Sequence, residues 1–127
     1  MKIQKSSEDY LEMILMLQEK KGFARSIDIA MELCVTKPSV SYATKRLREN
    51  GYITMDTDGH ITLTQSGHDI AFRMYNRHKM LTNFLISTGI DEETAREDAC
   101  KMEHDLSDKS FEALGRFSNW PQEKCKQ

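Results

Sequence analysis

The chain has 127 residues, of which 39% are hydrophobic and 30% are charged, and these proportions fit one compact unit or a small domain with an appendage. The formal net charge of −2 excludes a protein that is basic throughout, and no apolar run approaches the length of a membrane-spanning helix. The first residues contain no apolar stretch of a signal peptide, and the three cysteines have no paired spacing, so we expect a reduced cytoplasmic protein.

Charge is distributed unevenly along the chain. Between Thr36 and Asn50 there are four basic residues and one acidic residue, whereas from Asn76 to the end eight basic residues face ten acidic ones. One part of the molecule therefore suits phosphates and the other suits cations.

The first third of the chain contains three predicted helices. Apolar periodicity predicts a helix from Ser6 or Ser7 to Lys21, with Ser6 and Asp9 arranged as a capping box. Ser26 is expected to cap a short helix over residues 27–33. After a tight turn at residues 34–35, Thr36 is expected to cap a third helix that Gly51 ends.

A β-hairpin is predicted directly after the third helix. The β-branched runs 52–55 and 60–64 alternate in polarity, and the turn-forming residues 56–59 separate them. Two helices joined by a tight turn and followed by a hairpin are typical of a winged helix-turn-helix, whose second helix enters the major groove of DNA.

The third helix leaves basic and hydroxyl side chains on its outer face. These side chains could be an ordinary solvated face, but the hairpin that follows favours contact with DNA phosphates and base edges. The candidate DNA-contacting residues are Arg25, Thr36, Lys37, Pro38, Ser39, Ser41, Tyr42, Lys45, Arg46 and Arg48.

The rest of the chain is predicted to be helical. Thr64 is expected to cap a long helix that ends near Ser87, a further helix should run from Asp91 to about Asp105, and Ser107 should open a last one. We expect the tail after Pro121 to be frayed. Since this region has little core of its own, its apolar stripe predicts a dimer interface. The sequence thus predicts a mainly α protein, with a winged-helix domain at 1–70 and a helical metal-binding and dimerisation domain at 71–127.

A cluster of possible metal ligands lies near the end of the predicted 91–105 helix. Cys100, Glu103 and His104 are spaced i, i+3, i+4, which places a thiolate, a carboxylate and an imidazole on one helical face. The candidates to complete a site are Asp9, Glu12 and His78. A solvated charged face with a buried cysteine is the alternative. No nucleophile or Gly-rich loop accompanies the cluster, so the sequence predicts no enzyme.

Several short motifs, taken together at their separations, resemble the DtxR/MntR family of metal-dependent bacterial repressors over nearly the full length. They are Glu8-Asp-Tyr-Leu-Glu12, Asp28-Ile-Ala, Pro38-Ser-Val-Ser41, Leu63-Thr-x-x-Gly67, Arg77-His78, Asp98-Ala-Cys-x-x-Glu-His104 and Leu106-Ser-Asp. The resemblance implies a homodimer that binds double-stranded operator DNA when a divalent metal is bound. By residue matching it also implies the ligands Asp9, Glu12, His78, Cys100, Glu103 and His104.

The chain differs from both branches of that family. It resembles the manganese-sensing branch at Asp9 and in its short length without an SH3-like domain, but the iron-sensing branch at Cys100. Where the iron branch has a second site, this chain has Thr82 and Arg96. The expected metal is Fe(II) or Mn(II), with Co(II), Ni(II) and Zn(II) as substitutes in vitro. A winged-helix regulator that senses an organic ligand and a nonhaem metalloenzyme are the alternative functions.

Overall fold

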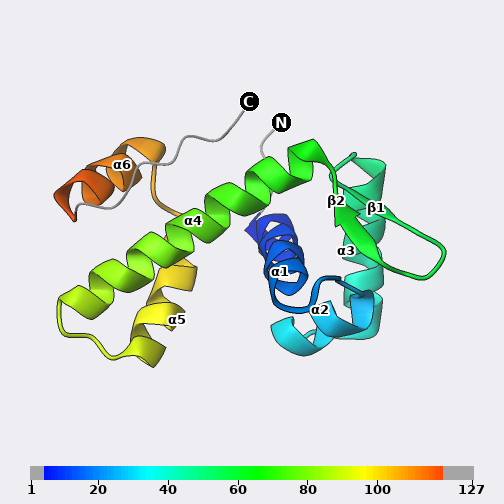
Figure 1. Ribbon diagram of the computed structural model, residues 1–127, viewed down its shortest axis with the longest axis horizontal. Coiled ribbons are helices and arrows are strands. Elements are labelled where there is room, and N and C mark those ends of the chain that lie inside the picture. Colours follow the sequence, from blue (N-terminus) through cyan, green and yellow to red (C-terminus); the bar gives the residue numbers. More distant parts are fainter. Residues whose placement is uncertain (1–4, 119–127) are drawn as a thin grey trace. The chain divides into compact units, whose positions relative to one another are not determined.

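The computed structural model describes residues 5–118, and contacts between residues divide the chain into a first unit, Met1–Phe72, and a second unit, Arg73–Gln127. The predicted frayed tail after Pro121 lies outside the described residues. Figure 1 shows the elements, which are α1 (Lys5–Lys21), α2 (Ser26–Leu33), α3 (Lys37–Glu49), β1 (Ile53–Met55), β2 (Ile61–Leu63), α4 (Gln65–Ser87), α5 (Glu92–Met102) and α6 (Asp108–Phe117). The chain is therefore mainly helical, as predicted.

The first unit has the predicted winged helix-turn-helix fold. Its helices α1, α2 and α3 surround a core of fully buried aliphatic side chains, and strand β1 pairs antiparallel with β2 to form the wing (Figure 1). On α3, Val40, Thr44 and Leu47 point into this core, so the opposite face of the helix is exposed.

The junction between the wing and α4 requires a glycine. Thr64 caps α4 as predicted, since its Oγ1 accepts from Gly67 N at 3.2 Å, and the same hydroxyl donates to Gly51 O at 2.7 Å. A Cβ atom added to Gly67 would lie 2.1 Å from the carbonyl oxygen of Tyr52. No side chain fits this close approach between backbones.

The turn between α2 and α3 contains a strained residue. Cys34 has φ 57° and ψ 45°, and it is the only described residue besides glycines with a positive φ. The amide groups of Cys34 and Val35 both donate to Ala30 O, which closes the C-terminus of α2.

Replacing Cys34 by Gly should raise the free energy of unfolding by up to about 1 kcal/mol, because glycine adopts this backbone conformation without steric cost. Denaturant midpoints of the wild type and of Cys34→Gly would measure the gain. Cys34→Ala, which keeps a Cβ atom, is the matched control and should show no gain. A Gly variant no more stable than the Ala variant would contradict the expectation.

The second unit packs the latter part of α4 against α5 and α6. Met80, Leu81 and Ala99 are buried, and apolar side chains from the α5–α6 region, such as Phe111 and Leu114, pack against them. Ser107 caps α6 as predicted, and Asp91 caps α5 by accepting from Thr94 N at 3.0 Å. This bond is the main reason that the pKa of the Asp91 carboxyl lies below its ordinary value.

Three predicted helix ends are wrong. The first helix already includes Ser6, so Ser6 is not its N-cap and does not form the expected capping box with Asp9. Ser26 is the first helical residue of α2, and Arg25 occupies the N-cap position without a side-chain hydrogen bond. Helix α5 ends at Met102 rather than near Asp105.

Among the described residues, 5–118, no helix combines the length and the apolar character needed to cross a membrane.

Candidate metal centre and nucleic-acid interface

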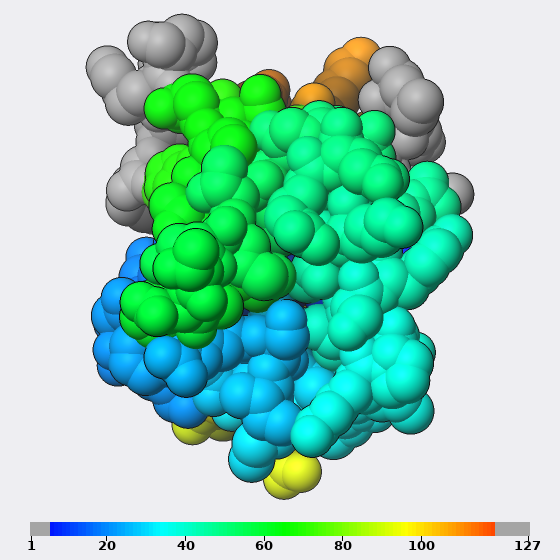
Figure 2. Space-filling view, turned by 90° about the vertical axis from the view of Figure 1, so that its right-hand side faces the viewer, coloured from blue at the N-terminus to red at the C-terminus, as the bar shows by residue number. Residues whose placement is uncertain are grey.

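The candidate DNA-binding surface is the outer face of α3 together with the residues that precede it. All ten predicted DNA-contacting residues are exposed: Arg25, Thr36, Lys37, Pro38, Ser39, Ser41, Tyr42, Lys45, Arg46 and Arg48. Figure 2 views the side of the first unit on which α3, the wing and the α2 region lie next to one another. Most of these residues lie on α3, whereas Thr36 is the N-cap of α3 and Arg25 is the N-cap of α2.

Two contacts within the chain fix side chains of this surface in the absence of DNA. The Thr36 hydroxyl accepts from Ser39 N at 3.2 Å and so caps α3, as predicted. Arg46 Nη1 donates to the Tyr42 hydroxyl at 3.3 Å, and its guanidinium lies 5.8 Å from the centre of the Tyr42 ring. A guanidinium held in this way loses less side-chain entropy when it binds a phosphate.

The wing contributes a residue that the sequence analysis missed. Arg25 Nη2 lies 3.1 Å from Nε2 of His60, which begins the second run of the hairpin. Nothing in the sequence pairs these residues, because 35 positions separate them and only the folded wing brings them together.

In the second unit, Glu103 lies between two imidazoles. Its side chain is fully buried, with Oε1 3.0 Å from His78 Nδ1 and Oε2 3.5 Å from His104 Nε2. His78 comes from α4, whereas Glu103 and His104 follow the last turn of α5. Both imidazoles are shielded, with side-chain exposures of 19% for His78 and 2% for His104.

This donor set fits a divalent transition metal. Imidazole nitrogens and carboxylate oxygens are ligands that such ions accept, and a buried carboxylate requires compensating positive charge. The second unit therefore brings together three of the six predicted ligands: His78, Glu103 and His104.

Cys100 differs from Glu103 in its exposure to solvent. Its side chain is exposed, whereas that of Glu103 is fully buried, and α5 ends between the two residues. Glu103 itself keeps helical backbone angles, φ −62° and ψ −26°, and its N–H donates to Ala99 O, so the helical spacing continues from Cys100 to Glu103. That Cys100 joins Glu103 and His104 as a ligand stays a prediction.

Asp9 and Glu12 belong to the first unit, where they lie one turn apart on α1. Glu12 is buried, with 6% of its surface exposed, and Asp9 is half-buried. Carboxylates three residues apart face the same side of a helix, so both can serve one ion.

Arg77 was noted in the sequence only as a neighbour of His78, but it holds the turn that carries Glu103. Its side chain is buried, and Nη1 donates to Glu103 O at 3.0 Å and to Leu106 O at 2.7 Å. Nη2 pairs with the Asp108 carboxylate, and the guanidinium lies 5.1 Å from the centre of the Phe111 ring. One side chain therefore ties α4 to the turn and to the start of α6.

Two family descriptions match nearly the whole chain. Residues 2–61 match the N-terminal DNA-binding domain of iron-dependent repressors, and residues 64–127 match their metal-binding and dimerisation domain. The two halves of the chain thus match one domain that binds DNA and one that binds metal and dimerises.

Individual relatives agree with these matches. The chain is 39% identical over 110 residues to the HTH-type transcriptional regulator MntR of Bacillus subtilis strain 168, covering 87% of this chain and 78% of that protein. It is 37% identical over 111 residues to the transcriptional regulator MntR of Escherichia coli O6:H1, covering 87% and 72%.

Solved structures show the same fold. The manganese regulator SloR matches 95% of this chain with a TM-score of 0.80 and 30% identity, and a manganese-dependent transcriptional repressor in complex with manganese matches 91% with a TM-score of 0.83 and 28% identity. The chain spans only 56% and 54% of these two structures, a little over half of their length.

Proposed function

From the membership of this chain in the DtxR/MntR family of metal-dependent transcriptional repressors, we propose that it represses genes of metal-ion homeostasis and is activated for operator binding by Fe(II) or Mn(II). The observation that carries this proposal is the buried Glu103 carboxylate between His78 and His104, in the domain that matches metal binding. The family comprises regulators rather than enzymes, so the chain is not a metalloenzyme. The cytoplasm, where operators lie, is the proposed compartment.

The proposed ligand set combines both units. His78, Glu103 and His104 provide donors from the second unit, with Cys100 as a further ligand from α5, and Asp9 and Glu12 provide carboxylates from α1. Support comes from the donor chemistry of these residues and from their match to the family pattern. A bound divalent ion supplies positive charge that offsets the carboxylates.

The proposed switch follows from charge. Without compensation, Asp9, Glu12 and Glu103 repel one another, so α1 and the DNA-binding domain that contains it would be loosely held. Once the carboxylates are neutralised, a homodimer holds its two α3 helices about 34 Å apart, the spacing of successive major grooves on one side of DNA. Affinity for DNA then rises through preorganisation, while the contacts with DNA stay the same.

On the DNA side, the proposed roles follow from side-chain chemistry. Lys45, Arg46 and Arg48 suit phosphates, whereas Ser39, Ser41 and Tyr42 suit base edges or sugars. Each of them is exposed, as such contacts require.

The test is fluorescence anisotropy under anaerobic conditions, with duplex DNA from upstream of the chain's own gene. Fe(II), Mn(II), Co(II) and Zn(II) are titrated separately, with a chelator as control. We expect binding that appears with metal and is lost in chelator, and the order of potency ranks the metals. Equally tight and sequence-specific binding in chelator would reject the metal switch and favour a regulator that senses an organic ligand.

Replacing Cys100 by Glu should increase the potency of Mn(II) as an activator roughly tenfold relative to Co(II), because a carboxylate is a harder donor than a thiolate. The measurement is the metal concentration that gives half-maximal DNA binding. Cys100→Ser removes the thiolate without adding a carboxylate and should not show this gain. Equal Mn(II) potency in the wild type and Cys100→Glu would show that residue 100 does not contact the ion.

A further inference from the structure

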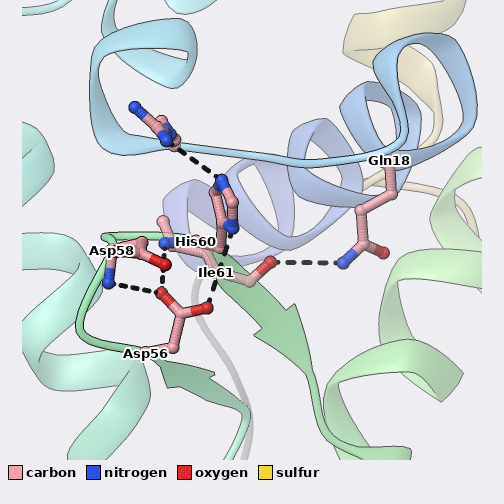
Figure 3. Close-up of polar contacts among 6 residues, drawn as sticks. Gln18, Asp56, Asp58, His60 and Ile61 are labelled. Atoms are coloured by element: carbon pink, nitrogen blue, oxygen red, sulfur yellow. Dashed lines mark hydrogen bonds and ion pairs between the residues drawn. The ribbon is translucent and has the colours of Figure 1, made fainter.

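A polar network connects the wing to the segment between α1 and α2. Asp56 Oδ1 accepts from the backbone amides of Asp58 and His60, each at 2.9 Å, and the His60 ring continues this network (Figure 3). The His60 Nε2 atom faces Arg25 Nη2 at 3.1 Å, and the His60 Nδ1 atom lies 3.7 Å from Asp56 Oδ2. The imidazole thus stands between a carboxylate and a guanidinium.

The hydrogen-bonding chemistry of the two neighbours selects the tautomer of the His60 ring that fits this arrangement. A guanidinium only donates hydrogen bonds, so Nε2 must accept and the ring proton must be on Nδ1. The carboxylate of Asp56 favours a proton on that side. The pKa of this carboxyl lies below its ordinary value, mainly because the His60 amide donates to it, so Asp56 is ionised at neutral pH.

Hydrogen bonds to the backbone of Ile61 fix the position of the wing next to the segment that contains Arg25. Ile61 N donates to Ala24 O at 2.8 Å, which joins β2 to the segment before α2, and Gln18 Nε2 donates to Ile61 O at 3.2 Å (Figure 3). The Phe23 ring lies 5.5 Å from the His60 ring and 5.9 Å from the Arg25 guanidinium. Arg25 and His60 therefore meet on a framework of main-chain bonds and ring contacts.

We propose that His60 is a positioning residue for DNA binding, which holds the Arg25 guanidinium at the wing so that its remaining N–H groups meet a DNA phosphate. This inference rests on the proposed function, in which Arg25 is a phosphate contact. Figure 2 shows the wing next to the segment that contains Arg25, on the face that also presents α3. A long side chain that is already held loses less freedom on binding, an advantage of roughly three- to tenfold in affinity.

A double-mutant cycle tests the inference on the full chain loaded with Mn(II), with the labelled duplex from upstream of its gene as the probe. The variants are Arg25→Ala, His60→Ala, His60→Gln and the double variant Arg25→Ala/His60→Ala. His68→Ala replaces an exposed histidine of α4 and is the matched control. Anisotropy gives the affinity at several salt concentrations, and circular dichroism confirms that each variant is folded.

The expected results distinguish an effect of His60 on DNA binding that acts through Arg25 from a direct contact between His60 and DNA. Arg25→Ala should reduce the salt slope of binding by about 0.9, the value for one lost phosphate contact. His60→Ala should weaken binding by roughly three- to tenfold in the wild-type background and have no effect in the Arg25→Ala background. His60→Gln should restore the affinity, because its amide oxygen can accept from Arg25.

Two results would overturn the inference. One is an effect of His60→Ala that persists in the Arg25→Ala background, which would make His60 an independent contact or a structural residue. The other is an unchanged affinity of Arg25→Ala or of His60→Ala. In either case, Mn(II)-dependent binding by the wild-type chain would still support the proposed function, so the two failures are distinguishable.

Discussion

Replacing Glu103 by Gln should raise the metal concentration for half-maximal DNA binding about 100-fold or more, while the chain stays folded. Substitution of residues that only support a ligand costs 10- to 100-fold in metal affinity, and Glu103 is proposed as a ligand itself. Gln has nearly the same shape as Glu and can still form hydrogen bonds with the two flanking imidazoles, but it lacks the negative charge that a divalent ion requires.

The measurement combines metal titration of DNA binding with chemical unfolding of the metal-free protein. Burial of a carboxylate costs free energy. The free energy of unfolding of the metal-free Gln variant should therefore be close to, or above, that of the metal-free wild type. Glu97→Gln, on the exposed side of α5, is the matched control. An unchanged metal response in Glu103→Gln would exclude Glu103 from the metal site.

Replacing Arg77 by Leu should lower the free energy of unfolding by about 3 kcal/mol. The substitution removes charge-assisted hydrogen bonds to Glu103 O and Leu106 O, and each such bond contributes about 1.5–3 kcal/mol. Loss of the ion pair with Asp108 lowers the free energy of unfolding less, because the Asp108 side chain is 77% exposed and water solvates its carboxylate when Arg77 is replaced. Lysine cannot replace the planar fork of arginine, so Arg77→Lys should recover only part of the stability.

Denaturant unfolding at matched protein concentrations would measure this effect, since dimerisation makes stability depend on concentration. The control is Arg96→Leu. Arg96 forms an ion pair with Glu92 in which both side chains are 64% exposed, so its loss should cost less than about 1 kcal/mol. Similar losses in the two variants would show that the contacts of Arg77 do not stabilise the turn.

Local signals in the sequence were sufficient for much of the fold. Thr36, Thr64 and Ser107 each cap the helix that was predicted to follow them, and the hairpin lies where alternating β-branched runs flank a turn. These features depend on residues a few positions apart, which is the range over which sequence patterns are informative.

The end of α5 could not be predicted in this way. Neither a glycine nor a proline lies between Met102 and Asp105 to mark a stop, so periodicity alone extends the helix to Asp105. In the structure, the carbonyls of Glu103 and Leu106 accept from Arg77, which precedes them by 26 and 29 residues. A tertiary contact thus accompanies the helix end.

The site residues also divide into those that the sequence indicates and those that only tertiary contacts reveal. Residue types identified His78, Glu103 and His104 as ligand candidates, and the structure brings these three together. The roles of Arg77 and His60 depend on partners that are distant in sequence, so no local pattern could indicate them.

The two units are continuous in sequence, with a single boundary between Phe72 and Arg73 inside α4. During translation, every residue of the first unit therefore leaves the ribosome before the second unit does. Domains generally fold as units, with the N-terminal one first, as the chain leaves the ribosome. The winged helix-turn-helix can thus form on the nascent chain before Glu103 and His104 have left the ribosome, so the DNA-binding fold can precede the metal-binding unit.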